Sequence, residues 1–178
     1  MDYVIRKAGL DERAAIEELI GLSARGLSRG DYTARQIEAA LTGAFGVDSS
    51  LILDGTYFVA ESAGRLVGCG GWSKRRTLFG GDRYAARDAA ELDPQTEPAR
   101  IRAFFVHPEH ARKGIGRAIL AACEKEARAH GFRALELMAT LPGVRLYEAC
   151  GYEAGARVKY ELGEGVSIEF VPMRKELP

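Results

Sequence analysis

The sequence lacks a surplus of either charge and lacks any long apolar run. Lys and Arg together number 25, as do Asp and Glu, so no excess positive charge exists to attract nucleic acid or an acidic membrane surface. No segment approaches the roughly 20 apolar residues of a membrane-spanning helix, and residues 1–20 lack the apolar stretch of a secretory signal. We therefore expect no nucleic-acid partner, no membrane partner and a cytoplasmic location.

Cysteines are few and poorly spaced for metal binding or redox chemistry. The three cysteines are Cys69, Cys123 and Cys150, and no two of them have the short spacing of a zinc site or of a redox dithiol. We therefore expect no metal centre and interpret each thiol as a small buried apolar residue.

What the sequence does contain is enough apolar side chains for one hydrophobic core. With 178 residues, of which 47% are apolar, the chain has the usual size of one domain, and we expect residues 1–178 to form a single one. Alternation, helical periodicity and Gly or Pro punctuation then divide the chain. They predict helices that begin near Asp11 and Thr33 or span 114–130 and 143–150, and strands at 3–8, 56–61, 65–72, 101–107, 134–140, 152–162 and 166–173.

A long connection, residues 73–99, separates two of the expected strands. Long loops in compact domains are usually functional or mobile, so we interpret this one as a candidate lid. The pattern over 84–92 is compatible with a short helix, and Pro94 and Pro98 argue against further regular structure.

A basic turn with two glycines precedes the helix expected at 114–130. Glycines let the backbone approach a ligand closely, and a helix start offers unpaired N–H groups and the positive end of the helix dipole. Cationic side chains around the same N–H groups fit a pyrophosphate, although a basic, solvated helix start would have the same composition. The turn consists of Arg112, Lys113, Gly114, Ile115, Gly116 and Arg117.

Two other nucleotide-binding motifs do not fit this turn. A Walker loop ends in Gly-Lys-Ser or Gly-Lys-Thr, which the chain lacks. A dinucleotide fingerprint needs a third glycine where Ile119 stands, and a strand directly before the turn. Both motifs are therefore set aside.

The order of motifs from Ile101 to Tyr152 is more specific than the turn alone. A strand that ends at Pro108 leads through the basic turn into an amphipathic helix, another strand and then Leu146-Tyr147-Glu148-Ala149-Cys150-Gly151-Tyr152. This order resembles the GNAT family of acetyl-CoA-dependent N-acetyltransferases. The resemblance implies an α/β (α+β) domain with a mixed, mostly antiparallel sheet of six to seven strands, splayed central parallel strands and about four flanking helices.

The resemblance also implies a cofactor, acetyl-CoA, and roles for individual residues. Backbone groups of Phe105 and Val106 would contact the pantetheine arm and thioester, with the Val106 N–H as the donor to the developing oxyanion. Tyr147 would act as the acid that protonates the leaving thiolate. Ala111 and Pro142 stand where relatives usually have Gln or Arg and Asn, and the second departure puts one contact to the cofactor arm in doubt.

The base that deprotonates the attacking ammonium is left open by the sequence. His107, at the end of a strand, and Glu61, in a hairpin, are two candidates, and relay through water is a third. The acceptor is equally open, because carboxylates in the long connection would suit an amine and arginines there would suit a carboxylate-bearing substrate. These residues are Asp82, Asp88, Glu91 and Asp93, and Arg75, Arg76, Arg83 and Arg87.

The leading hypothesis is therefore an N-acetyltransferase that acts on a primary amine of a small molecule or of a peptide or protein. A small molecule is favoured because a long lid would close a site. The rivals are a non-catalytic CoA-sensing or protein-interaction module, against which Tyr147 argues, and a nucleotide-binding protein of different chemistry. Exposed strand edges are also compatible with a homodimer.

Overall fold

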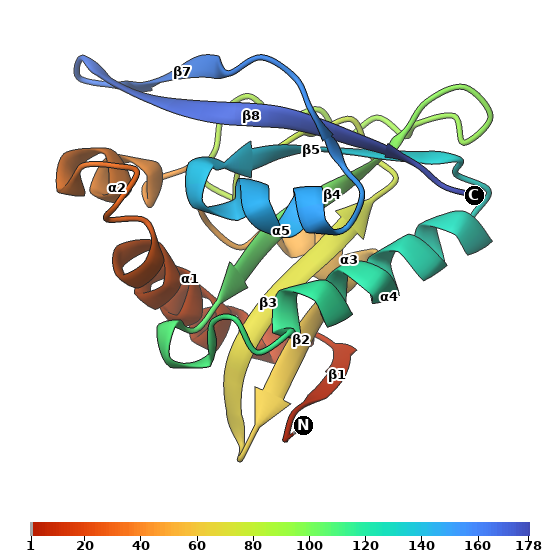
Figure 1. Cartoon of the computed structure of the whole chain (residues 1–178), viewed down its shortest axis with the longest axis horizontal. Helices are drawn as coiled ribbons and strands as arrows, with labels where there is room; N and C mark the ends of the chain where they lie inside the picture. The colour runs from red at the N-terminus through yellow and green to blue at the C-terminus, as the bar shows by residue number, and fades with distance from the viewer. Residues whose placement is uncertain (1) are drawn as a thin grey trace.

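The computed structural model describes residues 2–178, which form one mixed β-sheet with helices on both faces (Figure 1). The spatial order of the strands is β1-β2-β3-β4-β5-β8-β6, and β7 pairs with β8. The strands are β1 (Val4–Lys7), β2 (Tyr57–Ser62), β3 (Arg65–Ser73), β4 (Ala99–Val106), β5 (Ala134–Thr140), β6 (Glu153–Ala154), β7 (Val158–Gly163) and β8 (Val166–Glu176). The helices are α1 (Arg13–Leu27), α2 (Ala34–Ala40), α3 (Ser49–Leu53), α4 (Ile115–Ala129) and α5 (Val144–Ala149), with short 3-10 turns η1 (Leu10–Glu12), η2 (Pro108–His110) and η3 (Leu141–Gly143).

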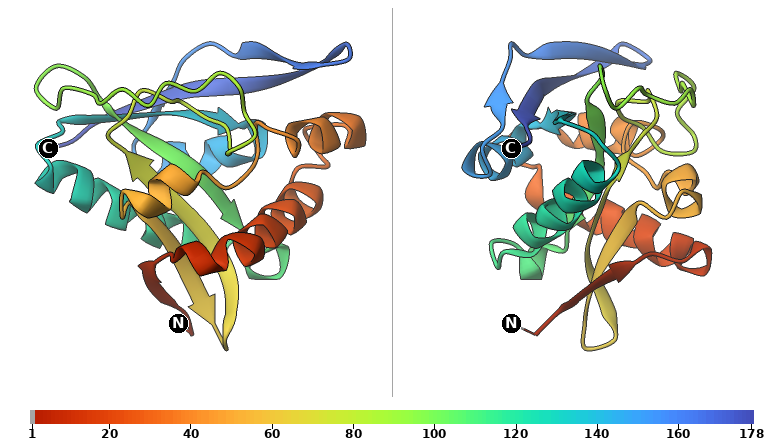
Figure 2. Two further views of the ribbon diagram at one scale, coloured as in Figure 1. Left: turned by 180° about the vertical axis from the view of Figure 1, so that it is seen from behind. Right: turned by 90° about the vertical axis from the view of Figure 1, so that its right-hand side faces the viewer.

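Within residues 2–178, β4 and β5 are the only parallel neighbours in the sheet. They pair at Ala99 with Leu135 and at Arg100 with Glu136, and then separate. Figures 1 and 2 show the two strands diverging from this corner. The expected mixed, mostly antiparallel sheet with splayed parallel strands is confirmed, and beyond Arg100 the edge of β4 that faces β5 has no strand partner.

Different helices cover the two faces of the sheet, as the right-hand view of Figure 2 shows. Each fully buried Ile or Leu contributes about 1.5–3 kcal/mol relative to an exposed one, so a continuous apolar stripe fixes how a helix packs. The stripe of α4 recurs every four residues, as predicted, and α1 packs on the opposite face. The buried residues are Ile115, Ile119, Cys123 and Ala127 in α4, and Ile16, Leu19, Ile20 and Ser23 in α1.

The start of α2, a helix that the sequence predicts to begin near Thr33, has a capping box. The Thr33 hydroxyl accepts a hydrogen bond from the Gln36 N–H (3.1 Å), and the Gln36 side chain accepts one from the Thr33 N–H (2.8 Å). The two bonds satisfy N–H groups that a helix start otherwise leaves unpaired.

A bulge in β4 changes which side chains face each layer. Between Cys69 and Gly71 of β3, β4 has one residue more than its partner. Ala103 accommodates the extra residue with a positive φ of 52°. After the bulge, Phe104 packs on the side of α4 and Phe105 packs on the side of α1.

Two expectations about the elements were wrong, and one helix was not predicted. Residues 84–92 contain no helix, and the strand expected at 152–162 is interrupted, because β6 has two residues and β7 begins at Val158. The five-residue helix α3 was not predicted, since it is too short to show a helical period. The described chain therefore has an eight-stranded sheet and five α-helices.

The connection between β3 and β4 folds back on itself and lies against residues 43–47. Its two arms are joined by a hydrogen bond from Thr77 N to Asp88 O (3.0 Å). Gly81 N donates to Gly43 O (2.9 Å), which attaches the tip of the connection to the segment before α3. In this arrangement the connection forms a wall beside β4.

Candidate active site

The basic turn forms the N-terminus of α4. Gly114 precedes the helix with a φ of +83°, and Arg112 also has a positive φ of 62°. The first hydrogen bond of the helix runs from Ala118 N to Gly114 O (3.0 Å), so the N–H groups of residues 115–117 have no partner within the helix. Together with the helix dipole, these N–H groups make this end of α4 suitable for an anion.

Gly116 brings the turn against α5. It is buried, and a Cβ atom at this position would lie 3.0 Å from Leu146 Cδ2. Ile115 is also buried and packs against Gly68 of β3, where a Cβ would approach its Cγ2 to 2.5 Å. The turn therefore presents Gly114 and its cationic side chains to solvent, and the exposed cations are Arg112, Lys113 and Arg117.

A cavity opens between β4 and β5 where the two strands part. Tyr147 of α5 and the loop residues 44–46 and 78–80 complete its wall. Among residues 2–178, the single charged side chain that lines the cavity is Arg102. The rest of the wall is largely aromatic or aliphatic, namely Phe45, Phe79, Phe104, Phe105, Phe170, Leu78, Ile101, Leu137 and Met138.

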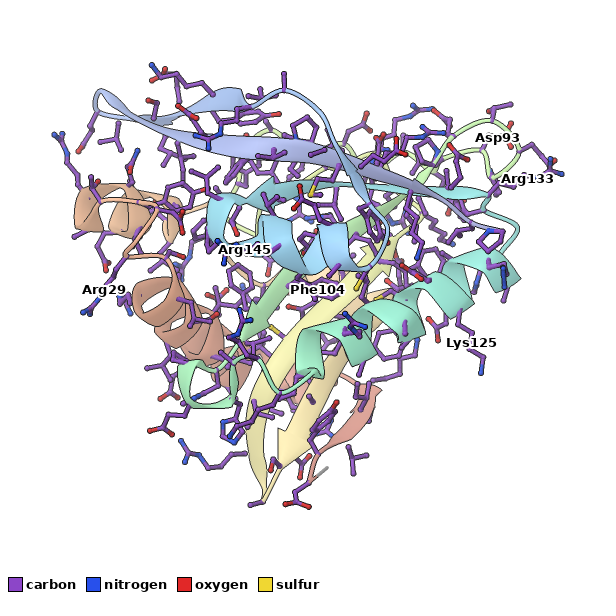
Figure 3. The ribbon with its side chains drawn as sticks, viewed as in Figure 1. Arg29, Asp93, Phe104, Lys125, Arg133 and Arg145 are labelled. Atoms are coloured by element: carbon purple, nitrogen blue, oxygen red, sulfur yellow. The ribbon has the colours of Figure 1, made fainter. Side chains whose placement is uncertain are left out.

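Tyr147 is held in this cavity by other aromatic rings. Its ring packs edge-on against Phe104 (6.2 Å between centroids) and Tyr152 (5.8 Å). Phe104 accordingly lies beside α5 in Figure 3. Burial raises the pKa of the Tyr147 phenol well above its usual value, so the hydroxyl keeps its proton at neutral pH.

Tyr57 fixes the direction of one peptide group in the β4 bulge. The Tyr57 side chain is fully buried on the α1 face, and its hydroxyl donates to Ala103 O at 2.9 Å. In a trans peptide the C=O and the next N–H point in opposite directions, and residues 2–178 contain no cis peptide bond. The Phe104 N–H is therefore directed away from the α1 face, toward the side of the sheet on which Tyr147 lies.

The backbone of Val106, in contrast, already has a partner. Its N–H donates to the hydroxyl of Ser23 on α1 at 3.2 Å. We expected this N–H to be the donor to the oxyanion, but one N–H makes one good hydrogen bond, so the bulge makes the Phe104 N–H the better-directed donor. The Val106 side chain remains near the turn, since its Cγ2 would be 3.9 Å from a Cβ at Gly116.

The two candidate bases lie in a second cleft, which α1 forms with the β2–β3 hairpin. Glu61 accepts hydrogen bonds from Arg6 Nε (3.0 Å) and Nη2 (2.7 Å), and Arg6 also binds Glu12. His107 lines the same cleft, and its Nδ1 accepts from Glu109 N at 3.2 Å. The fold therefore places Glu61 and His107 in the same cleft, and neither of them lines the cavity of Tyr147.

The ionic groups of the long connection are mostly paired with each other or with the body of the domain. Asp48, which is buried before α3, binds both Arg87 (2.5 Å) and Arg102 (3.0 Å). Other pairs join Arg75 to Asp54 (2.8 Å), Arg76 to Glu97 (2.6 Å), Arg13 to Asp82 (2.8 Å) and Lys74 to Glu91 (3.3 Å). None of the carboxylates expected to attract an amine lines the cavity, as far as residues 2–178 are concerned.

Sequence reasoning missed Arg102, Tyr57 and Ser23. Arg102 has a signal, because a charged residue inside the apolar run 101–106 must be paired or functional. Ser23 has one too, as a hydroxyl within the apolar face of a helix. Tyr57 has none, since its partner depends on a bulge in a strand 46 residues away along the chain.

Over residues 2–178, no group of three or more His, Cys, Asp or Glu side chains is placed to hold a metal ion. In the same residues, no helix is both long and apolar enough to cross a membrane.

Comparisons with known proteins agree with this geometry. A model of the acetyltransferase (GNAT) family matches residues 29–152. No curated protein gives a significant match to the sequence. Solved structures resemble the chain over nearly its whole length, at sequence identities low enough that the likeness shows the fold alone.

Three of these structures illustrate the likeness. A GCN5-related N-acetyltransferase from Rhodopseudomonas palustris has a TM-score of 0.74 at 20% identity, covering 99% of this chain and 97% of that one. The PaiA N-acetyltransferase from Thermoplasma acidophilum, in complex with coenzyme A, has a TM-score of 0.66 at 16% identity, covering 99% of each chain. YncA from Salmonella typhimurium, with acetyl-CoA, has a TM-score of 0.65 at 20% identity, covering 100% of this chain and 95% of that one.

Proposed function

Because the chain belongs to the acetyltransferase (GNAT) family, we propose that it transfers an acetyl group from acetyl-CoA to the primary amine of a small molecule. The carrying observation is that Phe104 and the unionised Tyr147 phenol line one cavity between β4 and β5, and that the first turn of α4 packs against α5, the helix that carries Tyr147. Solved structures of similar fold contain coenzyme A or acetyl-CoA, which supports the choice of cofactor.

The residues of the cleft fit this cofactor. Acetyl-CoA would supply an activated acetyl group, as a thioester, and a diphosphate. The first-turn N–H groups of α4 would hold the diphosphate, because Gly114 and Gly116 have no side chain that would cover them. Backbone groups of Phe105 and Val106 lie on the part of β4 that β5 has left, where they would contact the pantetheine arm. The exposed cations Arg112, Lys113 and Arg117 would add electrostatic attraction.

Two groups of the chain would act on the charge that develops during acetyl transfer. The Phe104 N–H would donate to the carbonyl oxygen as it becomes negative, and Tyr57 preorganises this donor by holding Ala103 O on the opposite face. Tyr147 would donate its proton to the leaving sulfur. A phenol is protonated at physiological pH, and burial, which raises the pKa of Tyr147, keeps it so.

The cavity itself would help the amine to lose its proton. An apolar environment disfavours an ammonium ion and lowers its pKa, and the described residues place no carboxylate in the wall to oppose this effect. We therefore favour deprotonation in or on entry to the cavity, with water as the carrier. His107 and Glu61 remain candidates for the base, acting from the second cleft through water.

Thermal-shift measurements and an amine panel test this function. Acetyl-CoA and CoA should raise the melting temperature and exceed the effect of ATP and NAD, because a ligand stabilises the state that binds it. Thiol release from acetyl-CoA should then depend on an added amine. A CoA shift without amine-dependent thiol release would instead support a CoA-sensing module, and a larger ATP or NAD shift would support a different nucleotide-binding chemistry.

A further inference from the structure

The wall of the cavity selects against strongly hydrophilic acceptors. Phe45 and Phe79 enter it from two loops, and Phe170 enters from β8. The Phe170 ring packs near both of the others, with its centroid 6.2 Å from that of Phe45 and 5.2 Å from that of Phe79. An acceptor that fills this space exchanges water for aromatic surface, which favours an apolar body and penalises additional charged groups.

Arg102 is the exception in this wall, and its hydrogen bonds are incomplete. The side chain is 3% exposed, and its Nη2 donates to Asp48 Oδ2 (3.0 Å) and Gly80 O (2.7 Å). The Nε–H has no partner among residues 2–178, although it is buried. A buried donor without a partner normally costs about 1–3 kcal/mol, so an unpartnered donor on a residue that lines a cavity points to a ligand oxygen.

We propose that the acceptor is an amine with an apolar, aromatic-sized body and a carboxylate, and that Arg102 binds the carboxylate through its Nε–H. This inference rests on the proposed function and specifies its substrate class. A carboxylate suits the site because a charged acceptor makes the stronger hydrogen bond to a guanidinium. A polyamine does not suit it, because its extra ammonium groups would meet apolar rings and a cation.

The arginines of the long connection do not compete for this role. Arg75, Arg76 and Arg87 are each paired with a carboxylate of the domain, and none of them lines the cavity. Among the residues the structure describes, Arg102 is therefore the cationic residue that lines the cavity and also retains an unpartnered N–H.

Matched pairs of amines test the proposal. We would compare L-phenylalanine with phenethylamine, and L-leucine with isopentylamine, so that each pair differs by one carboxylate, and include spermidine as a hydrophilic amine. Ligand-observed NMR would measure binding in the presence of CoA, and thiol release would measure acetylation. The carboxylate member of each pair should bind about 10- to 100-fold more tightly, and spermidine should bind least. Equal affinity within the pairs, or preference for spermidine, would overturn the proposal.

Two variants of Arg102 assign the effect to this residue. Arg102→Met should abolish the discrimination within each pair, because both members then meet an apolar side chain at this position. Arg102→Lys keeps a cation for Asp48 but has no Nε–H, so it should reduce the discrimination even if the Met variant fails to fold. Arg100→Met is the matched control, since Arg100 is on the same strand, pairs with Glu136 and lies outside the cavity wall.

These measurements distinguish a wrong substrate class from a wrong acetyltransferase function. If amines without a carboxylate are acetylated equally well, the protein is an acetyltransferase and the proposed substrate class is wrong. A second outcome is that no amine is acetylated, although the carboxylate member of each pair still binds more tightly and this preference depends on Arg102. The protein would then bind the proposed class of molecule as a ligand, and the proposed transferase function would be wrong.

Discussion

The two clefts of this molecule lie along one sheet, and their linings differ in kind. Within the described part of the chain, the cavity between β4 and β5 has aromatic walls and one cationic residue, Arg102, whose Nε–H has no partner. The cleft beside α1 instead has Arg6, Glu12 and Glu61 joined in ion pairs of 2.6 and 2.7 Å. Charged groups that satisfy one another hold β1 and β2 against η1. Groups that are buried without partners are available for a ligand. Chemical activity is therefore expected in the apolar cavity and not in the charged cleft.

Gly116→Leu should have the largest effect, because a side chain on the first turn of α4 would crowd the N–H groups proposed to hold the diphosphate. We expect CoA binding to weaken by at least about 100-fold, equivalent to about 2.7 kcal/mol. Calorimetric titration with CoA measures this, and Gly30→Ala is the control, since nothing lies within 4 Å of a Cβ there. A large fall in the melting temperature of the ligand-free variant would instead assign Gly116 to packing against Leu146.

Tyr147→Phe should lower kcat by about 100-fold or more while CoA affinity changes little, since the variant removes the acid and keeps the ring. Initial rates with saturating acetyl-CoA measure this. Burial raises the Tyr147 pKa, so this hydroxyl also adds stability below its unfolded pKa of about 10 that is lost as pH rises further. The Phe variant should lack that alkaline loss. Wild-type turnover in the variant would remove the acid role.

Tyr57→Phe should lower kcat by about tenfold without changing CoA affinity, because the Ala103 carbonyl loses the bond that orients the Phe104 N–H. The free energy of unfolding should fall by about 1 kcal/mol. Tyr152→Phe is the control, since it loses a bond to Glu124 (3.1 Å) on the other face. If both variants keep full turnover at the wild-type pH profile, the bulge does not depend on this hydroxyl.

Glu61→Gln and His107→Gln should have the smallest effects, because both residues line the charged cleft. Turnover should stay within about twofold, and the free energy of unfolding should change by less than about 1 kcal/mol, because Glu61 is in a partly exposed ion pair and His107 accepts one hydrogen bond, from Glu109 N. If turnover in either variant drops roughly 100-fold and the acidic limb of its pH profile is displaced, that residue is the base. Part of the chemistry would then belong to the second cleft.

The elements of this fold were largely predictable because their signals are local. The stripe from Ile115 to Ala127 needs only a period of 3.6 residues, and the capping box at Thr33 needs only Gln36 three residues later. The basic turn was predictable for the same reason, since glycine, cationic side chains and a helix start are adjacent in the chain.

The parts that could not be predicted depend on register between distant strands. The sequence nominated Val106 as the donor, but the bulge at Ala103 and the hydroxyl of Ser23 decide which N–H is available. It nominated His107 and Glu61 as bases from residue type, whereas the fold places both in the cleft between α1 and the β2–β3 hairpin, outside the lining of the Tyr147 cavity. Arg102 was visible as a charge in an apolar strand, but its pairing with Asp48 spans 54 residues.

The bond between Tyr57 and Ala103 separates two tasks that many active sites combine. The residue that orients the backbone donor comes from β2, while the residues that shape the acceptor space come from two loops and β8 and pack in the same core cluster as Tyr57. Replacing the loop phenylalanines should therefore allow a redesigned enzyme to admit new amines without rebuilding the group that activates the acetyl carbonyl.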